Sequence, residues 1–284
     1  MYRMAMLLGL LVAIMSVSAF GVGFIGTPTA ELKQGQWNVG FNYMYSDMEL
    51  DKAKMTGVWS EFDAAGDLVD GGPELYKLEI DDVKTQRYYG TIGYGLTNVW
   101  EAYVQLGIAD LKAETRDADD PEDEWSGLNF DNDFAWGWGT RYTFYEQDNI
   151  RWGVSVQMNW LDTSWDVTIA EEVAGGTETE KTQIDWETYD LIIAVGPTIN
   201  MGGWNLYGGP FYYMIDGDLD VSGTETWPTG GSEIWKESGD LEEDSNFGGF
   251  VGVQCTMMEN YDVTTEISFT GDGWAIGAGV CCAF

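Results

Sequence analysis

The chain closes on the stretch Trp274-Ala-Ile-Gly-Ala-Gly-Val-Cys-Cys-Ala-Phe284, and this stretch decides the fold. The larger apolar side chains stand at every second position, and very small side chains fill most positions between them. Successive side chains of a β-strand point to opposite faces, so the pattern predicts a strand with one bulky face and one small-residue face. Soluble domains seldom end in this way, because chain termini are usually loose and polar.

Nine further segments alternate in the same manner. They span residues 37–46, 87–96, 100–108, 133–144, 151–160, 189–199, 204–221, 247–257 and 261–269. A soluble β-sandwich would also alternate, but its outward face would carry Lys, Glu and Thr. Here the second face consists mainly of Gly, Ala, Ser and Asn with a few charges, which suits the crowded polar interior of a membrane barrel.

The connections between these ten segments are of two kinds. Short turns follow the second, fourth, sixth and eighth segments, and long gaps follow the first, third, fifth and seventh. Transmembrane barrels join their strands by short turns on one side and long loops on the other. We therefore predict an all-β fold: a membrane-embedded antiparallel up-and-down β-barrel of about ten strands, with both chain ends on the short-turn side.

Aromatic residues recur at one depth of the predicted barrel. Trp37, Trp100, Trp152, Trp204 and Tyr261 each stand first on the outward face of a strand, beside a chain end or a short turn. Aromatic side chains gather at the interfaces between membrane and water. We therefore expect these five residues to form the girdle at the periplasmic interface.

The first residues have the form of a secretory signal peptide. Arg3 supplies a positive charge, an apolar run extends over residues 4–15, and small residues lead to a cleavage position after Ala19. The run is too short for a membrane-spanning helix, which needs about 20 residues. We divide the chain into a signal peptide (1–19), an N-terminal lead-in segment (20–35) and a transmembrane β-barrel (36–284).

Together these features resemble small, porin-like outer-membrane β-barrel proteins of Gram-negative bacteria. In that family the last strand ends in an aromatic residue, and Phe284 matches this position. The resemblance implies that Phe284 is part of an insertion signal read by the outer-membrane insertion machinery. It also implies an outer-membrane location, with the lipid bilayer as the main partner. The segment 23–30 resembles the Gly-rich start of some of these barrels.

The charge excludes several partners. The chain carries a net charge of −35, and removing Arg3 with the signal peptide takes it from −35 to −36. Such a chain repels nucleic acid and anionic surfaces. It also contains 14 Trp, 15 Tyr and 12 Phe, which must be buried in protein or lipid.

The residue types needed for catalysis are scarce. The chain has no His, the commonest general base and metal ligand. The enzymes among small outer-membrane barrels depend on a His, so this part of the resemblance fails here. The three cysteines show no strong disulfide or metal spacing. We expect no catalytic residue and no bound cofactor, although pairs of carboxylates leave a surface hydrolase as a less favoured alternative.

The predicted outer loops hold most of the acidic residues. Asp117, Asp119, Asp120 and Asp123 are candidate ligands for a divalent cation such as Ca²⁺, which takes six to eight oxygen atoms. The spacing lacks the Gly and the terminal Glu of an EF-hand loop. A solvated acidic surface is the simpler interpretation.

The inward face carries a small set of charged residues. They are Arg87, Glu101, Arg141, Arg151, Asp190, Asp262 and Glu266. Charges in a narrow lumen must be paired, so a structural network of ion pairs is one interpretation. A charged lining that selects ions is another. The main hypothesis is a non-catalytic barrel that anchors acidic extracellular loops, with the passage of small solutes left open. The alternative is a narrow cation-preferring channel.

Overall fold

The computed structural model describes residues 23–120, 125–243, 246–258 and 260–284, and these residues form one antiparallel sheet. The signal peptide predicted at 1–19 lies outside the described residues. The strands are β1 (Trp37–Met48), β2 (Ala53–Phe62), β3 (Leu68–Thr97), β4 (Trp100–Asp117), β5 (Ser126–Asn129), β6 (Asp133–Gln147), β7 (Ile150–Val173), β8 (Gly176–Asn200), β9 (Trp204–Thr226), β10 (Ser232–Glu242), β11 (Phe247–Met258), β12 (Tyr261–Phe269) and β13 (Gly273–Ala283). No helix among the described residues is long and apolar enough to cross a membrane.

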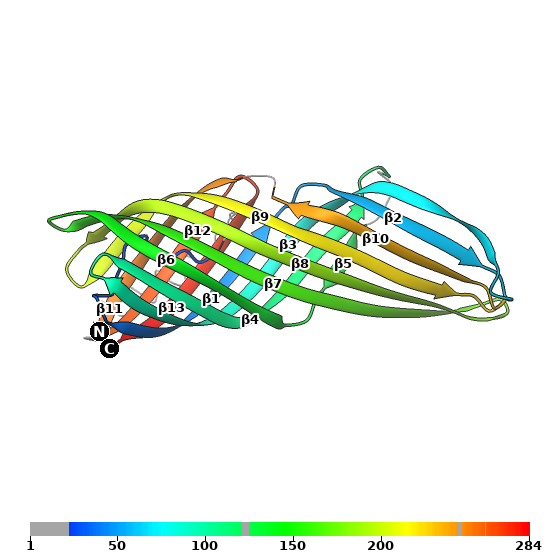
Figure 1. The fold of residues 1–284 in the computed structure, drawn as a ribbon, viewed down its shortest axis with the longest axis horizontal. Helices are drawn as coiled ribbons and strands as arrows, with labels where there is room; N and C mark the ends of the chain where they lie inside the picture. The colour runs from blue at the N-terminus through cyan, green and yellow to red at the C-terminus, as the bar shows by residue number, and fades with distance from the viewer. Residues whose placement is uncertain (1–22, 121–124, 244–245, 259) are drawn as a thin grey trace, which may run out of the picture.

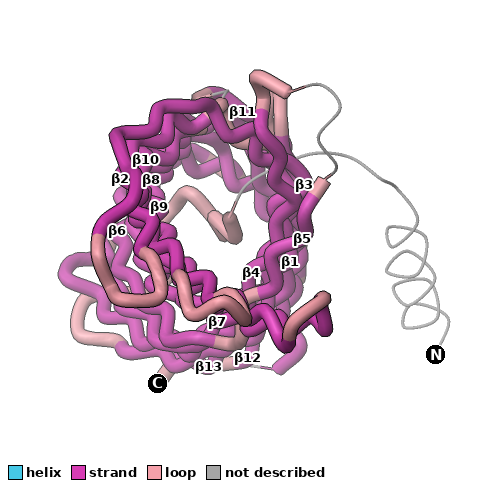
Figure 2. The backbone as a smooth tube through the Cα atoms, turned by 90° about the vertical axis from the view of Figure 1, so that its right-hand side faces the viewer, coloured by secondary structure: helices cyan, strands magenta, loops and turns pink. Residues whose placement is uncertain are grey.

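Ten of these strands close into a ring, as the sequence predicts (Figure 2). The order around the ring is β1, β3, β4, β6, β7, β8, β9, β11, β12 and β13, and β13 returns to β1. The last pairing runs without interruption from Asn38 opposite Ala283 to Met48 opposite Gly273. The terminal strand that predicts the fold is therefore the strand that closes it.

Several strands continue far beyond the ring (Figure 1). β3, β7 and β8 contain 30, 24 and 25 residues, whereas a strand crosses a bilayer with about 9 to 11. β2 and β10 pair with each other and link the outer parts of β3 and β9. We call β2, β5, β10 and the outer parts of β3, β4, β7, β8 and β9 the outer extension. The sequence predicts acidic loops in this region. That prediction is wrong, because these residues form an ordered sheet.

The faces of the ring strands follow the predicted alternation. Trp136 and Ile193 are 41% and 39% exposed on the outside, whereas Ser155 and Ala194 are 2% and 0% exposed on the inside. An exposed apolar band around a closed barrel is the surface that faces lipid.

The alternation inverts where β7 leaves the ring. In the part of β7 that precedes Leu161 in the sequence, the apolar side chains point outward and polar ones, such as Asn159, point inward. From Leu161 onward, Asp162 points outward, and Leu161 and Trp165 point inward. Water surrounds the outer extension, so its apolar side chains are buried inside, as in a soluble protein.

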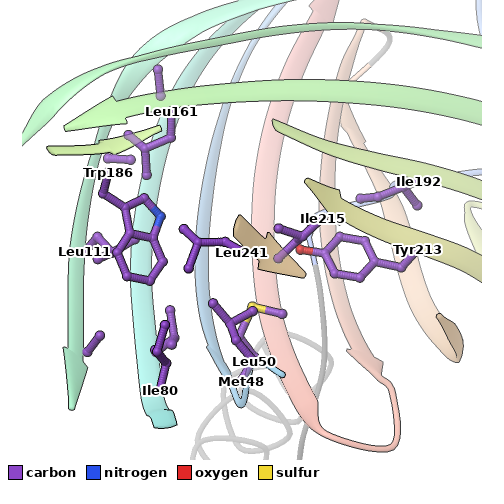
Figure 3. Packing of buried hydrophobic residues seen from close by; sticks show 14 of the residues in the cluster. Met48, Leu50, Ile80, Leu111, Leu161, Trp186, Ile192, Tyr213, Ile215 and Leu241 are labelled. Carbon is purple, nitrogen blue, oxygen red and sulfur yellow. The ribbon is translucent and has the colours of Figure 1, made fainter. Parts of the chain in front are cut away.

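An apolar core therefore fills the outer level of the barrel, where the sequence predicts a polar interior. Figure 3 shows side chains from strands around the barrel meeting at this level. The core includes Met55, Ile80, Leu111, Trp186, Leu219 and Leu241, which are at most 3% exposed. The polar interior predicted from the sequence occupies only the inner level, toward the chain ends.

Candidate functional site in the barrel lumen

The residues just before β1 fold back into the barrel. Figure 2 shows this loop inside the ring of strands. We call residues 23–35 the lumenal segment. Gly35 donates its backbone N–H to the Gly95 carbonyl at the rim (2.9 Å), and residues 25–30 are buried deeper inside. The sequence predicts only a lead-in at 20–35, and residues 20–22 lie outside the described part.

Two carboxylates bind the backbone of the lumenal segment. Glu266 accepts hydrogen bonds from the backbone N–H groups of Ile25 (2.8 Å) and Gly26 (2.9 Å). Glu101 accepts two in the same way, from Glu31 and Leu32, both at 2.8 Å. Bonds from N–H groups to a charged acceptor are stronger than neutral ones, so these four bonds fix the path of the segment through the lumen.

Two arginines complete the attachment. Arg151 donates to the carbonyl of Ala30 (2.7 Å) and pairs with the Glu31 carboxylate (2.8 Å). Arg141 pairs with the free oxygen of Glu101 at 2.9 Å. Glu31 and Glu101 are thereby each paired with an arginine, as buried charges require, whereas the Glu266 carboxyl is held by backbone N–H groups.

Glycines on the inner face provide the space. A Cβ at Gly153 would lie 2.4 Å from the carbonyl oxygen of Pro28, and one at Gly277 would lie 2.3 Å from the ring of Phe24. The small residues that the alternation places inward therefore leave room for the lumenal segment.

A second polar layer lies beyond the inner end of the segment. Arg87 pairs with Asp190 at 2.5 Å, and Asn159 donates to the same carboxylate at 2.6 Å. Gln105 in turn donates to Asn159. Ile25 of the lumenal segment belongs to the apolar core, so the segment adjoins both this polar layer and the core.

A small cavity of about 70 Å³ remains beside the segment. Its lining includes Glu101, Tyr103, Arg141, Gln254 and Cys281. It has room for a few water molecules and is too small for a drug-sized ligand, which needs at least about 300 Å³.

The structure brings most of the predicted lumen charges to this site. Arg87, Glu101, Arg141, Arg151, Asp190 and Glu266 all take part in the two layers. Asp262 stands apart near the rim, where Thr256 donates to it at 2.7 Å. The role of Glu31 and the docking of the segment in the lumen were not predicted, because a stretch without strand periodicity carries no signal of where it docks.

The other predicted residues lie outside the lumen. Trp37, Trp100, Trp152, Trp204 and Tyr261 are between 38% and 47% exposed on the outer surface. The backbone of Phe284 exchanges two hydrogen bonds with Trp37, at 2.9 and 3.1 Å, and its side chain is exposed.

The acidic residues proposed as cation ligands do not form a metal site in the described chain. Asp117 accepts a hydrogen bond from the backbone of Asp119. Asp120 also has an interaction partner, and Asp123 lies outside the described residues. Nowhere in the described ranges do three or more Cys, Asp or Glu side chains meet in an arrangement that could hold a metal ion.

Comparison with known proteins finds structural similarity alone. Neither a protein-family model nor a curated protein matches the chain. The outer-membrane protein OprG from Pseudomonas aeruginosa is 8% identical, with 89% of this chain and 97% of that chain covered and a TM-score of 0.39. The translocator domain of the autotransporter NalP from Neisseria meningitidis is 10% identical, with 89% and 90% covered and a TM-score of 0.42.

A third structure, the toluene transporter TodX from P. putida, is 11% identical, with 89% and 90% covered and a TM-score of 0.34. The described chain has the fold of a transmembrane β-barrel, a closed ring with a lipid-facing apolar band. This fold agrees with the location in the bacterial outer membrane that the sequence predicts.

Proposed function

We propose that this protein is a non-catalytic outer-membrane barrel that anchors an acidic extracellular sheet and is closed to solutes in its resting form. The observation that carries the proposal is the occupied lumen. The lumenal segment fills the inner level, and the apolar core around Trp186 fills the outer level. A solute could pass only if both levels rearranged.

The outer extension supports the role of an anchor. Its strands continue the barrel wall, so the extension is held rigidly above the membrane. Its outward face is strongly acidic and includes Asp162, Asp185, Glu187, Asp218 and Asp220. Such a surface stays soluble and repels anionic molecules.

The absence of His from the sequence supports a role without catalysis. The carboxylates inside the barrel are engaged by arginines or by the lumenal segment, so they have structural partners. We propose no cofactor for the same reason.

A narrow cation-preferring channel is the second candidate. It is favoured by the cavity beside the segment, which reaches Glu101. Without the segment, Glu101 and Glu266 would face an aqueous lumen, and carboxylates lining a pore attract cations.

Conductance of the refolded mature chain in a planar bilayer separates the two candidates. We expect no steady conductance from the anchor. A steady current with cation preference would overturn the closed state and favour the channel. Protease treatment of intact cells gives the second test, because an extracellular extension is cut from outside the cell and a periplasmic one is protected.

A further inference from the structure

A groove of about 350 Å³ lies on the outer surface of the barrel, where the ring meets the outer extension. It crosses β6, β7, β8 and β9. Strand register places Trp136, Trp160, Tyr189 and Asp216 side by side in one row. The next row outward holds Asp162, Glu187 and Asp218. One edge of the groove is thus aromatic, and the other edge is acidic.

The aromatic edge is a flat, ordered surface. The rings of Trp136 and Trp160 stack at 4.2 Å with 6° between their planes. Phe134 continues this edge and is 61% exposed. The face of an aromatic ring carries partial negative charge and attracts cations, and Trp does so most strongly.

The acidic edge carries negative charge, as the faces of the aromatic rings do. Tyr189 donates its hydroxyl to Asp216 at 2.6 Å, which fixes that carboxylate beside the aromatic row. Asp162, Glu187 and Asp218 complete the lining, and no Lys or Arg belongs to it. The groove therefore attracts organic cations and repels phosphate and sulfate groups.

The position of the groove defines the rest of the ligand. Its aromatic row lies at the outer end of the lipid-facing band, and its acidic row lies where the outward face becomes polar. An occupant meets lipid on one side and water on the other. We propose that the groove binds the ammonium group of a cationic amphiphile whose apolar body lies in the outer leaflet. The volume suits such a group, because ligand sites begin at about 300 Å³.

Calorimetric titration of octyltrimethylammonium into the protein in maltoside micelles tests the proposal. Octyl sulfate and octyl glucoside serve as anionic and neutral probes of the same chain length. We expect saturable binding of the cation alone. Equal binding of the glucoside or the sulfate would overturn the proposal, and so would the lack of saturable cation binding.

Matched variants separate the groove from general attraction to an acidic protein. The groove variant combines Asp162→Asn, Glu187→Gln and Asp218→Asn. The control combines Asp166→Asn, Asp185→Asn and Asp220→Asn, which remove the same charge from the same sheet face farther along the strands.

We expect the groove variant to weaken cation binding about tenfold, equivalent to about 1.4 kcal/mol. The control should change binding less than about twofold. An equal loss in both variants would show diffuse attraction and refute a site. A Trp160→Leu variant keeps every carboxylate and should also weaken binding, whereas unchanged binding would remove the aromatic edge from the proposal.

Discussion

The Glu266→Ala substitution tests how the lumenal segment is held. Glu266 is 5% exposed and accepts hydrogen bonds from the backbone N–H groups of Ile25 and Gly26. A bond to a charged acceptor contributes about 1.5 to 3 kcal/mol, so losing two weakens docking by about 3 to 6 kcal/mol. Even the lower figure changes the ratio of docked to undocked segment by about two orders of magnitude.

Two measurements report this change. Hydrogen exchange of the Ile25 and Gly26 amides should accelerate by about the same factor, because exchange follows the population of the open form. A charged maleimide should label Cys281 faster, since this thiol lines the cavity beside the segment. The labelling is done with Cys255→Ala and Cys282→Ala, which leave Cys281 as the only thiol.

Asp262→Ala is the matched control for Glu266→Ala. Asp262 is on the same strand, four residues away, and accepts a hydrogen bond from Thr256. Removing this carboxylate should leave amide exchange at Ile25 and Gly26 at the parental level. Asp262 lies opposite Cys281 in the register of β12 and β13, so Cys281 labelling is compared only between the parent and Glu266→Ala. If Glu266→Ala leaves amide exchange and Cys281 labelling unchanged, or if Asp262→Ala raises amide exchange equally, the assigned role of Glu266 is refuted.

Three further outcomes are expected. Val154→Arg places a charge in lipid and should lower the free energy of unfolding by about 2 to 4 kcal/mol. Equilibrium unfolding in bilayers of different thickness should show that this loss depends on thickness. The loss caused by Ser155→Arg, which points into the barrel, should not vary with thickness. Phe284→Asp should sharply reduce the amount of protein in the outer-membrane fraction, and parental levels would contradict a role in insertion. In the outer extension, burial raises the pKa of Glu237, which accepts a hydrogen bond from Tyr76 (2.6 Å). Because its pKa is raised in the folded state, the protonated Glu237 carboxyl stabilises the fold, and this contribution is lost as pH rises. The melting temperature should therefore increase from pH 8 to pH 5. Glu237→Gln should reduce this increase.

The ring was predictable because lipid imposes a strict rule on its strands. Outward positions such as Trp136 and Val154 must be apolar along the whole membrane span, so alternation is easily read from the sequence. The short turns and the closing strand follow from the same rule. The inward orientation of Glu101 and Glu266 was also predictable, because successive side chains of a strand point to opposite faces of the sheet.

The outer extension was not predictable by this rule, because the environment changes along a single strand. At Leu161 the outside becomes water, and the outward residues change from Val and Met to Asp and Ser. The alternation continues, but the outward face is now polar and the inward face apolar. In the sequence, acidic residues such as Asp162 therefore look like part of a loop. The partners in the lumen were beyond prediction for another reason: Gly26 and Glu266 are 240 residues apart, and no local pattern records such a contact.

The location of the lumenal segment also constrains how the protein is assembled. The segment is the earliest described part of the chain, yet its partner Glu266 lies on β12, the last strand but one. Contacts of such separation form late, because a long loop must close before they are made. The segment therefore reaches its full set of contacts only after β12 is in place, and β13 completes the enclosure by meeting β1 through Trp37 and Phe284. Insertion of this barrel ends with the earliest described residues enclosed by the last strands, so docking of the segment reports that the wall is complete.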